Sequence, residues 1–192
     1  MDRRLAAVLA ADVAGYTKRM EQDSAGTVTA WQGARDEVIS HTVTEYSGRI
    51  VKFTGDGFLA EFPTVQDAVS CAISMQKDLA TNSLDFRMGI NLGDIIDDGT
   101  DIHGEGVNVA ARIEALAKSG GICISGSVHE QVRHQLNYPF EDMGEIRVKN
   151  VSEPVRVVRI LSDGETPQRL NRLRTKLPGF SLLALAIAVA DL

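Results

Sequence analysis

The chain has 192 residues, 44% of them hydrophobic, and a formal net charge of −6 at pH 7. This composition predicts a globular protein with one domain of ordinary size and a short remainder. The acidic balance argues against nucleic acid as a partner, because general nucleic-acid binders carry basic patches, and it favours a small-molecule ligand. The two cysteines, Cys71 and Cys123, lack metal-ligand spacing, so we expect buried free thiols.

Apolar periodicity predicts the elements of the N-terminal half. They are a buried strand over residues 5–11, a long helix over 24–46 that Gly48 closes, a hairpin of strands 49–53 and 58–62, and a helix over 65–79. The hairpin turn, residues 54–57, reads Thr-Gly-Asp-Gly, and we expect its glycines to adopt positive φ.

The C-terminal half continues with alternating elements. They are a strand over 86–96 broken by Gly89 and Gly93, a turn over 97–100, a helix over 107–116, a strand over 122–124, a helix over 127–135, and strands near 140–148 and 155–161. Because strands and helices interleave without strict βαβ alternation, we predict the α+β fold class, a sandwich with helices packed on a mostly antiparallel central sheet.

The last residues differ from the rest of the chain. Residues 162–179 read as a basic linker, and 180–192 form an apolar tail about half as long as the roughly 20 residues that span a bilayer. Basic residues before an apolar run fit the positive-inside tendency. This pattern predicts membrane attachment through a longer protein that continues the segment. The alternative is a short tail that is disordered or docks on the domain.

Two carboxylates stand at predicted strand ends. Asp12 follows the strand over 5–11, and Asp56 lies in the hairpin turn. If those strands are neighbours, the aspartates meet and need a cation between them, for which Mg²⁺ is the natural candidate. Gly15 would let the adjacent loop approach a triphosphate, and the loop consists of Val13, Ala14, Gly15, Tyr16 and Thr17. The alternative is that Asp12 caps a helix and Asp56 is only a turn residue.

Two further pairs match parts of a nucleotide. Lys52 offers only donors and Asp101 only acceptors, which complements N1 and N6 of adenine and mismatches guanine. Asn108 and Arg112 are four residues apart and share a helix face, where an amide orients ribose and a guanidinium neutralises charge on phosphate oxygens. Each of these residues alone is more often a plain surface group, so the argument depends on their combination.

Four motifs, at residues 11–17, 51–57, 87–93 and 101–112, resemble those of the class III nucleotidyl cyclases, the adenylyl and guanylyl cyclase catalytic domains. The resemblance covers residues 4 to about 161 and implies a cyclase catalytic domain over 1–161 with a ferredoxin-like sandwich. It also implies roles for six residues: two ligands of Mg²⁺ or Mn²⁺ ions (Asp12 and Asp56), two that recognise adenine (Lys52 and Asp101), and two that stabilise the transition state (Asn108 and Arg112).

The implied reaction is attack of the ribose 3′-oxygen of ATP on its α-phosphorus, which releases pyrophosphate and forms 3′,5′-cyclic AMP. The resemblance further implies a head-to-tail homodimer with composite sites, two metal ions per site, and a cytoplasmic catalytic domain. A guanylyl cyclase and a catalytically silent nucleotide-binding module are the alternatives. His103 and Glu105 replace the Trp and Asp of familiar members, and we expect His103 to pack or face solvent.

Overall fold

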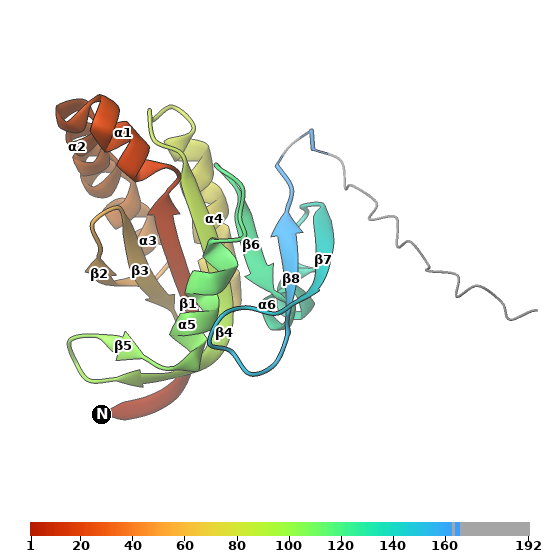
Figure 1. Cartoon of the computed structure of the whole chain (residues 1–192). Helices are drawn as coiled ribbons and strands as arrows, with labels where there is room; N and C mark the ends of the chain where they lie inside the picture. The colour runs from red at the N-terminus through yellow and green to blue at the C-terminus, as the bar shows by residue number, and fades with distance from the viewer. Residues whose placement is uncertain (163, 166–192) are drawn as a thin grey trace, which may run out of the picture.

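The computed structural model describes residues 1–162 and 164–165, which form a sheet with helices on both faces (Figure 1). Its strands are β1 (Asp2–Val13), β2 (Arg49–Phe53), β3 (Gly57–Phe62), β4 (Phe86–Asp97), β5 (Ile102–His103), β6 (Ile122–Ser125), β7 (Phe140–Ile146) and β8 (Val155–Ile160). Its helices are α1 (Tyr16–Gln22), α2 (Ser24–Gly33), the π-helical turn η1 (Ala34–Ile39), α3 (Ser40–Glu45), α4 (Val65–Leu79), α5 (Glu105–Glu114) and α6 (Gly126–Val132).

Within the described residues the sheet has eight strands in the order β2-β3-β1-β4-β6-β8-β7, and β5 pairs with β4. The β4–β6 pair is parallel, and every other pair is antiparallel. The predicted α+β fold with a mostly antiparallel sheet is therefore confirmed. The β4–β6 pair is parallel because helix α5 connects the two strands. A helical connection returns the chain to the end of the sheet where β4 began, so β6 runs in the same direction as β4.

Strand β1 is apolar on both faces because helices cover both sides of the sheet. Leu9 and Ala11 face one core, which includes Trp31 of α2 and Met75 of α4. The alternate residues, including Val8, face a second core with α5. This double burial explains why residues 5–11 form an uninterrupted apolar run instead of alternating with polar residues.

The predicted helix over 24–46 is present as a continuous helical path from α2 through η1 to α3. The helix ends at Glu45, and the N–H of Gly48 closes it by donating to the carbonyl oxygen of Val43 over 2.8 Å, while Ser47 adopts positive φ, at 58°. A Cβ on Gly48 would lie 2.4 Å from the ring of Phe62. Gly48 therefore provides space for an aromatic ring of the neighbouring sheet.

Two predictions about glycines are wrong for the same reason. Neither Gly55 nor Gly57 has positive φ; a Cβ on Gly57 would lie 2.1 Å from the carbonyl oxygen of Ala11. Strand β4 is also continuous, because Gly89 and Gly93 allow α5 to approach it and do not break it. Gly57, Gly89 and Gly93 permit close contact between backbones, a requirement that local sequence does not reveal, whereas a Cβ on Gly55 would have no neighbour within 4 Å.

We expect Gly89→Ala to lower the free energy of unfolding by about 1–3 kcal/mol, because the new Cβ would lie 2.1 Å from the backbone nitrogen of Glu114. Gly33→Ala is the matched control. Gly33 is helical and its Cβ would have no neighbour within 4 Å, so this change should stabilise by about 0.5–1 kcal/mol. Urea unfolding of both variants measures the difference. Equal midpoints would contradict the close approach of α5 to β4.

The structure also bears on the predictions about the cysteines and the C-terminal residues. Both cysteines are buried and form no disulfide, as expected. No helix among the described residues is long and apolar enough to cross a membrane. The predicted linker over 162–179 lies, apart from residues 162, 164 and 165, outside the described residues, and the tail over 180–192 lies wholly outside them.

Candidate active site

The two predicted carboxylates meet where β1 ends beside the β2–β3 turn. Asp12 is paired with Gly57 in the antiparallel register, and the N–H of Val13 donates to the carbonyl oxygen of Asp56 over 2.8 Å. Both aspartates are half-buried. The strand order therefore brings these two carboxylates to one edge of the sheet.

Arg87 contacts Asp12 from the other side, because β4 pairs Arg87 directly with Asp12. Its Nε donates to Asp12 Oδ1 over 3.0 Å, and its Nη2 donates to Oδ1 and Oδ2 over 2.8 and 2.6 Å. These hydrogen bonds raise the pKa of Arg87. Sequence analysis gave Arg87 no role. The available signal was a charged residue at the start of a strand whose next residues, 88–90, are apolar or glycine.

Glu114, the last residue of α5, is a second residue that sequence analysis missed. It is only 8% exposed, and its Oε1 lies 3.2 Å from Arg87 Nε without accepting a hydrogen bond from any described residue. Burial, followed by a hydrogen bond with Asp12 and the charges of Asp12 and Asp56, raises the pKa of Glu114 to about 8. The signal was its spacing from Ala110, which places Glu114 on the buried face of the helix.

The loop after Asp12 has fewer free amides than its sequence suggests. The N–H of Val13 donates to Asp56, and the N–H of Ala14 donates to the carbonyl oxygen of Asp85 over 2.8 Å. Gly15 adopts φ of 70° and precedes α1. The amides available to a ligand are therefore those of the remaining loop residues, Gly15, Tyr16 and Thr17, at the helix start.

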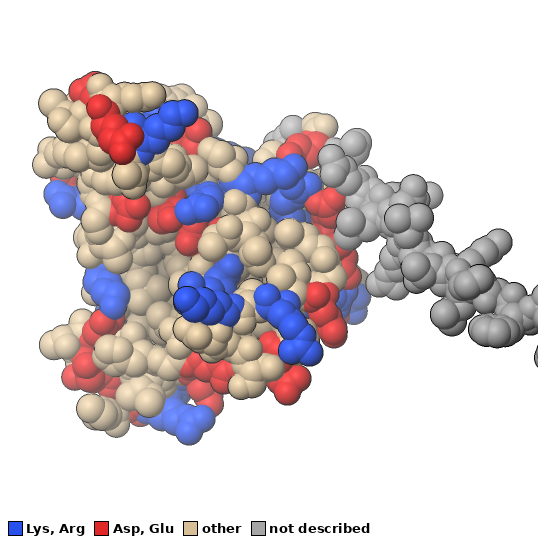
Figure 2. Space-filling model, viewed as in Figure 1, with Lys and Arg blue, Asp and Glu red and all other residues tan. Residues whose placement is uncertain are grey.

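The predicted base-recognition pair is in contact. Lys52 Nζ on β2 donates to Asp101 Oδ2, and the backbone N–H of Ile102 donates to Asp101 Oδ1 over 2.8 Å. The hydrogen bond from Lys52 lowers the pKa of Asp101. Figure 2 shows a hollow on the left of the molecule, and the same view in Figure 1 places α1 and α2 above it and the β5 hairpin below it. The Lys52 side chain, 46% exposed, is accessible to solvent.

A tight turn holds Asp101 in place. Asp98 Oδ1 accepts the backbone N–H groups of Thr100 and Asp101 over 2.9 and 2.8 Å, and these bonds hold the pKa of Asp98 well below its usual range. His103 is exposed, and its Nε2 lies 3.1 Å from Asp98 Oδ2. His103 therefore contacts the turn that carries Asp101 as well as solvent.

Asn108 and Arg112 lie on the exposed side of α5. Arg112 Nε donates to the carbonyl oxygen of Lys149 over 3.3 Å, in the connection between β7 and β8. Within the described ranges, no hydrogen bond or ion pair joins either residue to the carboxylates or to the Lys52–Asp101 pair. A single chain thus brings together the Asp12–Asp56 pair and the Lys52–Asp101 pair, whereas Asn108 and Arg112 face solvent.

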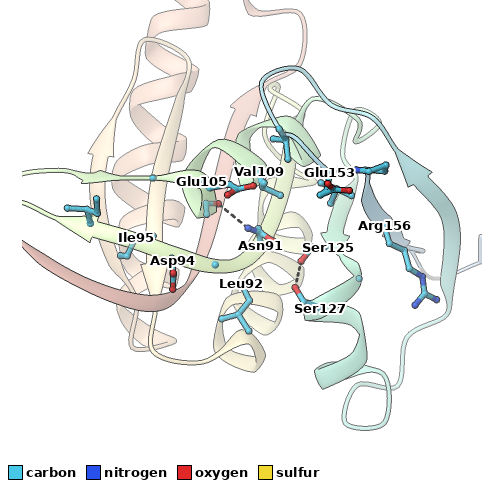
Figure 3. Close-up of a pocket in the computed structure, with 18 of the residues that line it drawn as sticks. Asn91, Leu92, Asp94, Ile95, Glu105, Val109, Ser125, Ser127, Glu153 and Arg156 are labelled. Atoms are coloured by element: carbon cyan, nitrogen blue, oxygen red, sulfur yellow. Dashed lines mark hydrogen bonds between the residues drawn. The ribbon is translucent and has the colours of Figure 1, made fainter.

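A cavity of about 680 Å³ lies elsewhere, between β4, the start of α5 and the β6–α6 junction. Figure 3 shows Asn91 and Asp94 of β4, Glu105 of α5, and Ser125 with Ser127 around it. Its acidic and basic side chains are mixed, and it contains none of the six residues of the three predicted pairs. We therefore place the candidate site at the carboxylate cluster and not in this cavity.

The carboxylate cluster suits a hard divalent cation that keeps part of its own hydration. In the described part of the chain, no group of three or more His, Cys, Asp or Glu residues is arranged to hold a metal ion. Asp12 and Asp56, the two residues of the carboxylate cluster, nevertheless supply oxygen donors at adjacent strand ends. Mg²⁺ and Mn²⁺ fit such a set, because few carboxylates suffice when water and phosphate complete the shell.

Comparison with known proteins gives consistent results. The family model of the adenylate and guanylate cyclase catalytic domain matches residues 4–161. A Rhizobium meliloti protein named "Putative adenylate cyclase 3" is 44% identical over 81% of this chain, which spans 28% of that protein. A Silicibacter pomeroyi structure named adenylate/guanylate cyclase/hydrolase is 40% identical, with a TM-score of 0.79 over 84% of this chain and 99% of that one. The structure of the P. aeruginosa adenylyl cyclase CyaB is 27% identical, with a TM-score of 0.73, and the match covers 84% of this chain and 95% of that one.

Proposed function

Because the chain belongs to the class III nucleotidyl cyclase family, we propose that it is an adenylyl cyclase that converts ATP to 3′,5′-cyclic AMP and pyrophosphate. The observation that carries the choice of base is the contact between Lys52 and Asp101. A donor and an acceptor held side by side complement the N1 and N6 positions of adenine. Guanine offers the opposite pattern and would leave polar groups unpaired.

The other residues have distinct roles in this proposal. Asp12 and Asp56 hold two Mg²⁺ or Mn²⁺ ions, which when bound lower the pKa of the ribose 3′-hydroxyl and neutralise charge on the triphosphate. Arg112 neutralises charge that develops on the α-phosphoryl oxygens, and Asn108 orients the ribose. The free amides at the start of α1 contact the triphosphate.

We further propose a head-to-tail homodimer with two composite sites. Support comes from α5, where Asn108 and Arg112 face outward and have no contact with this chain's own Asp12. A second copy would bring its α5 to the carboxylates, and the same contact repeated in reverse completes the other site. Each site then contains metal ligands from one chain and transition-state residues from its partner.

Two rival functions have weaker support. A guanylyl cyclase would need a different pair in place of Lys52 and Asp101, and a silent module would not need all three pairs intact. The chain spans only 28% of the length of its Rhizobium relative. The described domain itself carries every residue that the proposed reaction uses.

The purified chain with ATP and Mn²⁺ should form cyclic AMP, and with GTP it should form cyclic GMP at least about tenfold more slowly, because the Lys52–Asp101 pair mismatches guanine. Chromatographic separation of the products measures both rates. A parallel incubation without protein is the control. No cyclic product above this blank would contradict the cyclase activity, and equal rates would contradict the assignment to adenine.

A further inference from the structure

Arg87 and a metal ion require the same atoms. The guanidinium contacts both carboxylate oxygens of Asp12, at 2.8 and 2.6 Å from Nη2. A divalent cation bound to Asp12 uses those oxygens and brings its own positive charge next to the guanidinium. A metal ion can therefore bind Asp12 only if the Arg87–Asp12 hydrogen bonds break. Metal affinity then depends on whether the displaced guanidinium finds another partner.

Glu114 provides that position. Its Oε1 lies 3.2 Å from Arg87 Nε and is buried without a hydrogen bond from any residue in the described part of the chain. The Nε–H group is directed to Asp12 Oδ1, 3.0 Å away, so a small rotation of the guanidinium would transfer this donor to Glu114. An ionised Glu114 beside Asp12 and Asp56 is costly unless it has a cationic partner, which the displaced guanidinium would supply.

The approach of α5 to β4 fixes this arrangement. Gly89 lies two residues after Arg87 on β4, and only hydrogen at its Cα leaves space for the backbone of Glu114. The end of the helix is thereby held against the strand that carries Arg87. The carboxylate of Glu114 lies deep in the fold, which makes a general role in solubility or surface charge untenable.

We propose that Glu114 is a positioning residue that accepts the guanidinium of Arg87 when a divalent ion takes the oxygens of Asp12. The inference rests on the proposed metal-binding role of Asp12. Glu114 then favours metal binding indirectly, by stabilising the displaced arginine. Two other roles of Glu114 predict different results. If Glu114 were a direct metal ligand, its removal would weaken metal binding whether or not Arg87 is present. If Glu114 only anchored α5, its removal would not change the metal affinity.

A double-mutant cycle on Mn²⁺ affinity separates these roles, measured without nucleotide by the electron paramagnetic resonance signal of free Mn²⁺. Glu114→Gln should weaken Mn²⁺ binding about tenfold, because Arg87 then remains on Asp12. Arg87→Gln should strengthen binding, because the competing cation is gone. In the Arg87→Gln background, Glu114→Gln should change the affinity less than about twofold. Arg87→Lys, which keeps the charge, should give an intermediate affinity.

Three controls make the outcome decisive. Glu105→Gln removes an exposed carboxylate from the other end of α5 and should leave affinity within about twofold. Thermal unfolding identifies any variant that has lost its fold, and Arg87→Met, which also removes the charge, then replaces Arg87→Gln in the cycle. If Asp12→Asn leaves Mn²⁺ affinity unchanged, the metal assignment fails and this inference fails with it. If Asp12→Asn abolishes binding but Glu114→Gln has equal effects in both backgrounds, or none in either, only this inference is overturned.

Discussion

Asp12→Ala should reduce cyclic AMP formation at least about 1,000-fold, the largest loss that we expect from any single substitution. The reason is that Asp12 lies between Asp56 and Arg87, where the proposed metal ions act on both the attacking and the leaving oxygen. A loss of this size corresponds to about 4 kcal/mol of transition-state stabilisation. Initial rates with saturating Mn²⁺ measure it.

Asp85→Ala is the matched control for Asp12→Ala. Asp85 is in the neighbouring loop, its side chain is 59% exposed, and its nearest cation, Arg19, is 3.7 Å away. Its removal should leave the rate within about twofold, because exposed pairs contribute little. Circular dichroism should show that both variants keep the fold. An Asp12→Ala protein that retains more than a tenth of wild-type turnover would contradict the metal role.

Mixing Asp12→Ala protein with Arg112→Ala protein should restore activity that neither has alone. In a head-to-tail dimer, a mixed pair has one site with both defects and one site with none. If subunits exchange at random, half the dimers are mixed, and the mixture should reach about a quarter of wild-type activity. Cyclic AMP assays after incubation at high protein concentration measure the recovery.

The control for this experiment is a mixture of Asp12→Ala with Asp56→Ala. Both changes remove metal ligands, so every site in a mixed dimer keeps one defect and activity should stay at background. Chains with different affinity tags, purified together, establish that subunits have exchanged. Exchange without recovery, or equal recovery in the control mixture, would overturn the composite site.

Sequence reasoning predicted contacts best where strand ends determine them. The positions of Asp12 after a buried strand and of Asp56 in a hairpin turn were sufficient to expect their meeting, because neighbouring strands share an edge. The Lys52–Asp101 contact followed from the chemistry of adenine recognition, although the two residues are 49 positions apart. The catalytic roles of these residues stay predictions until the experiments above are done.

The features that sequence reasoning missed depend on tertiary packing. Gly57 and Gly89 were assigned to turn geometry and strand breaking, but each is determined by another backbone within van der Waals distance. Glu114 was not singled out, because only the docking of α5 on β4 makes it buried. Arg87 begins one of the four cyclase-like motifs, but its partner is set by strand register, which local periodicity leaves open.

Helix α5 also has a consequence for communication between sites. Its buried side ends at Glu114 beside this chain's Asp12, and its exposed side presents Asn108 and Arg112, which in the proposed dimer complete the partner's site. Close backbone contacts hold α5 against β4. In the proposed dimer, a displacement of α5 at one catalytic centre would also change the surroundings of Asp12 in the other, and this contact would couple the two sites.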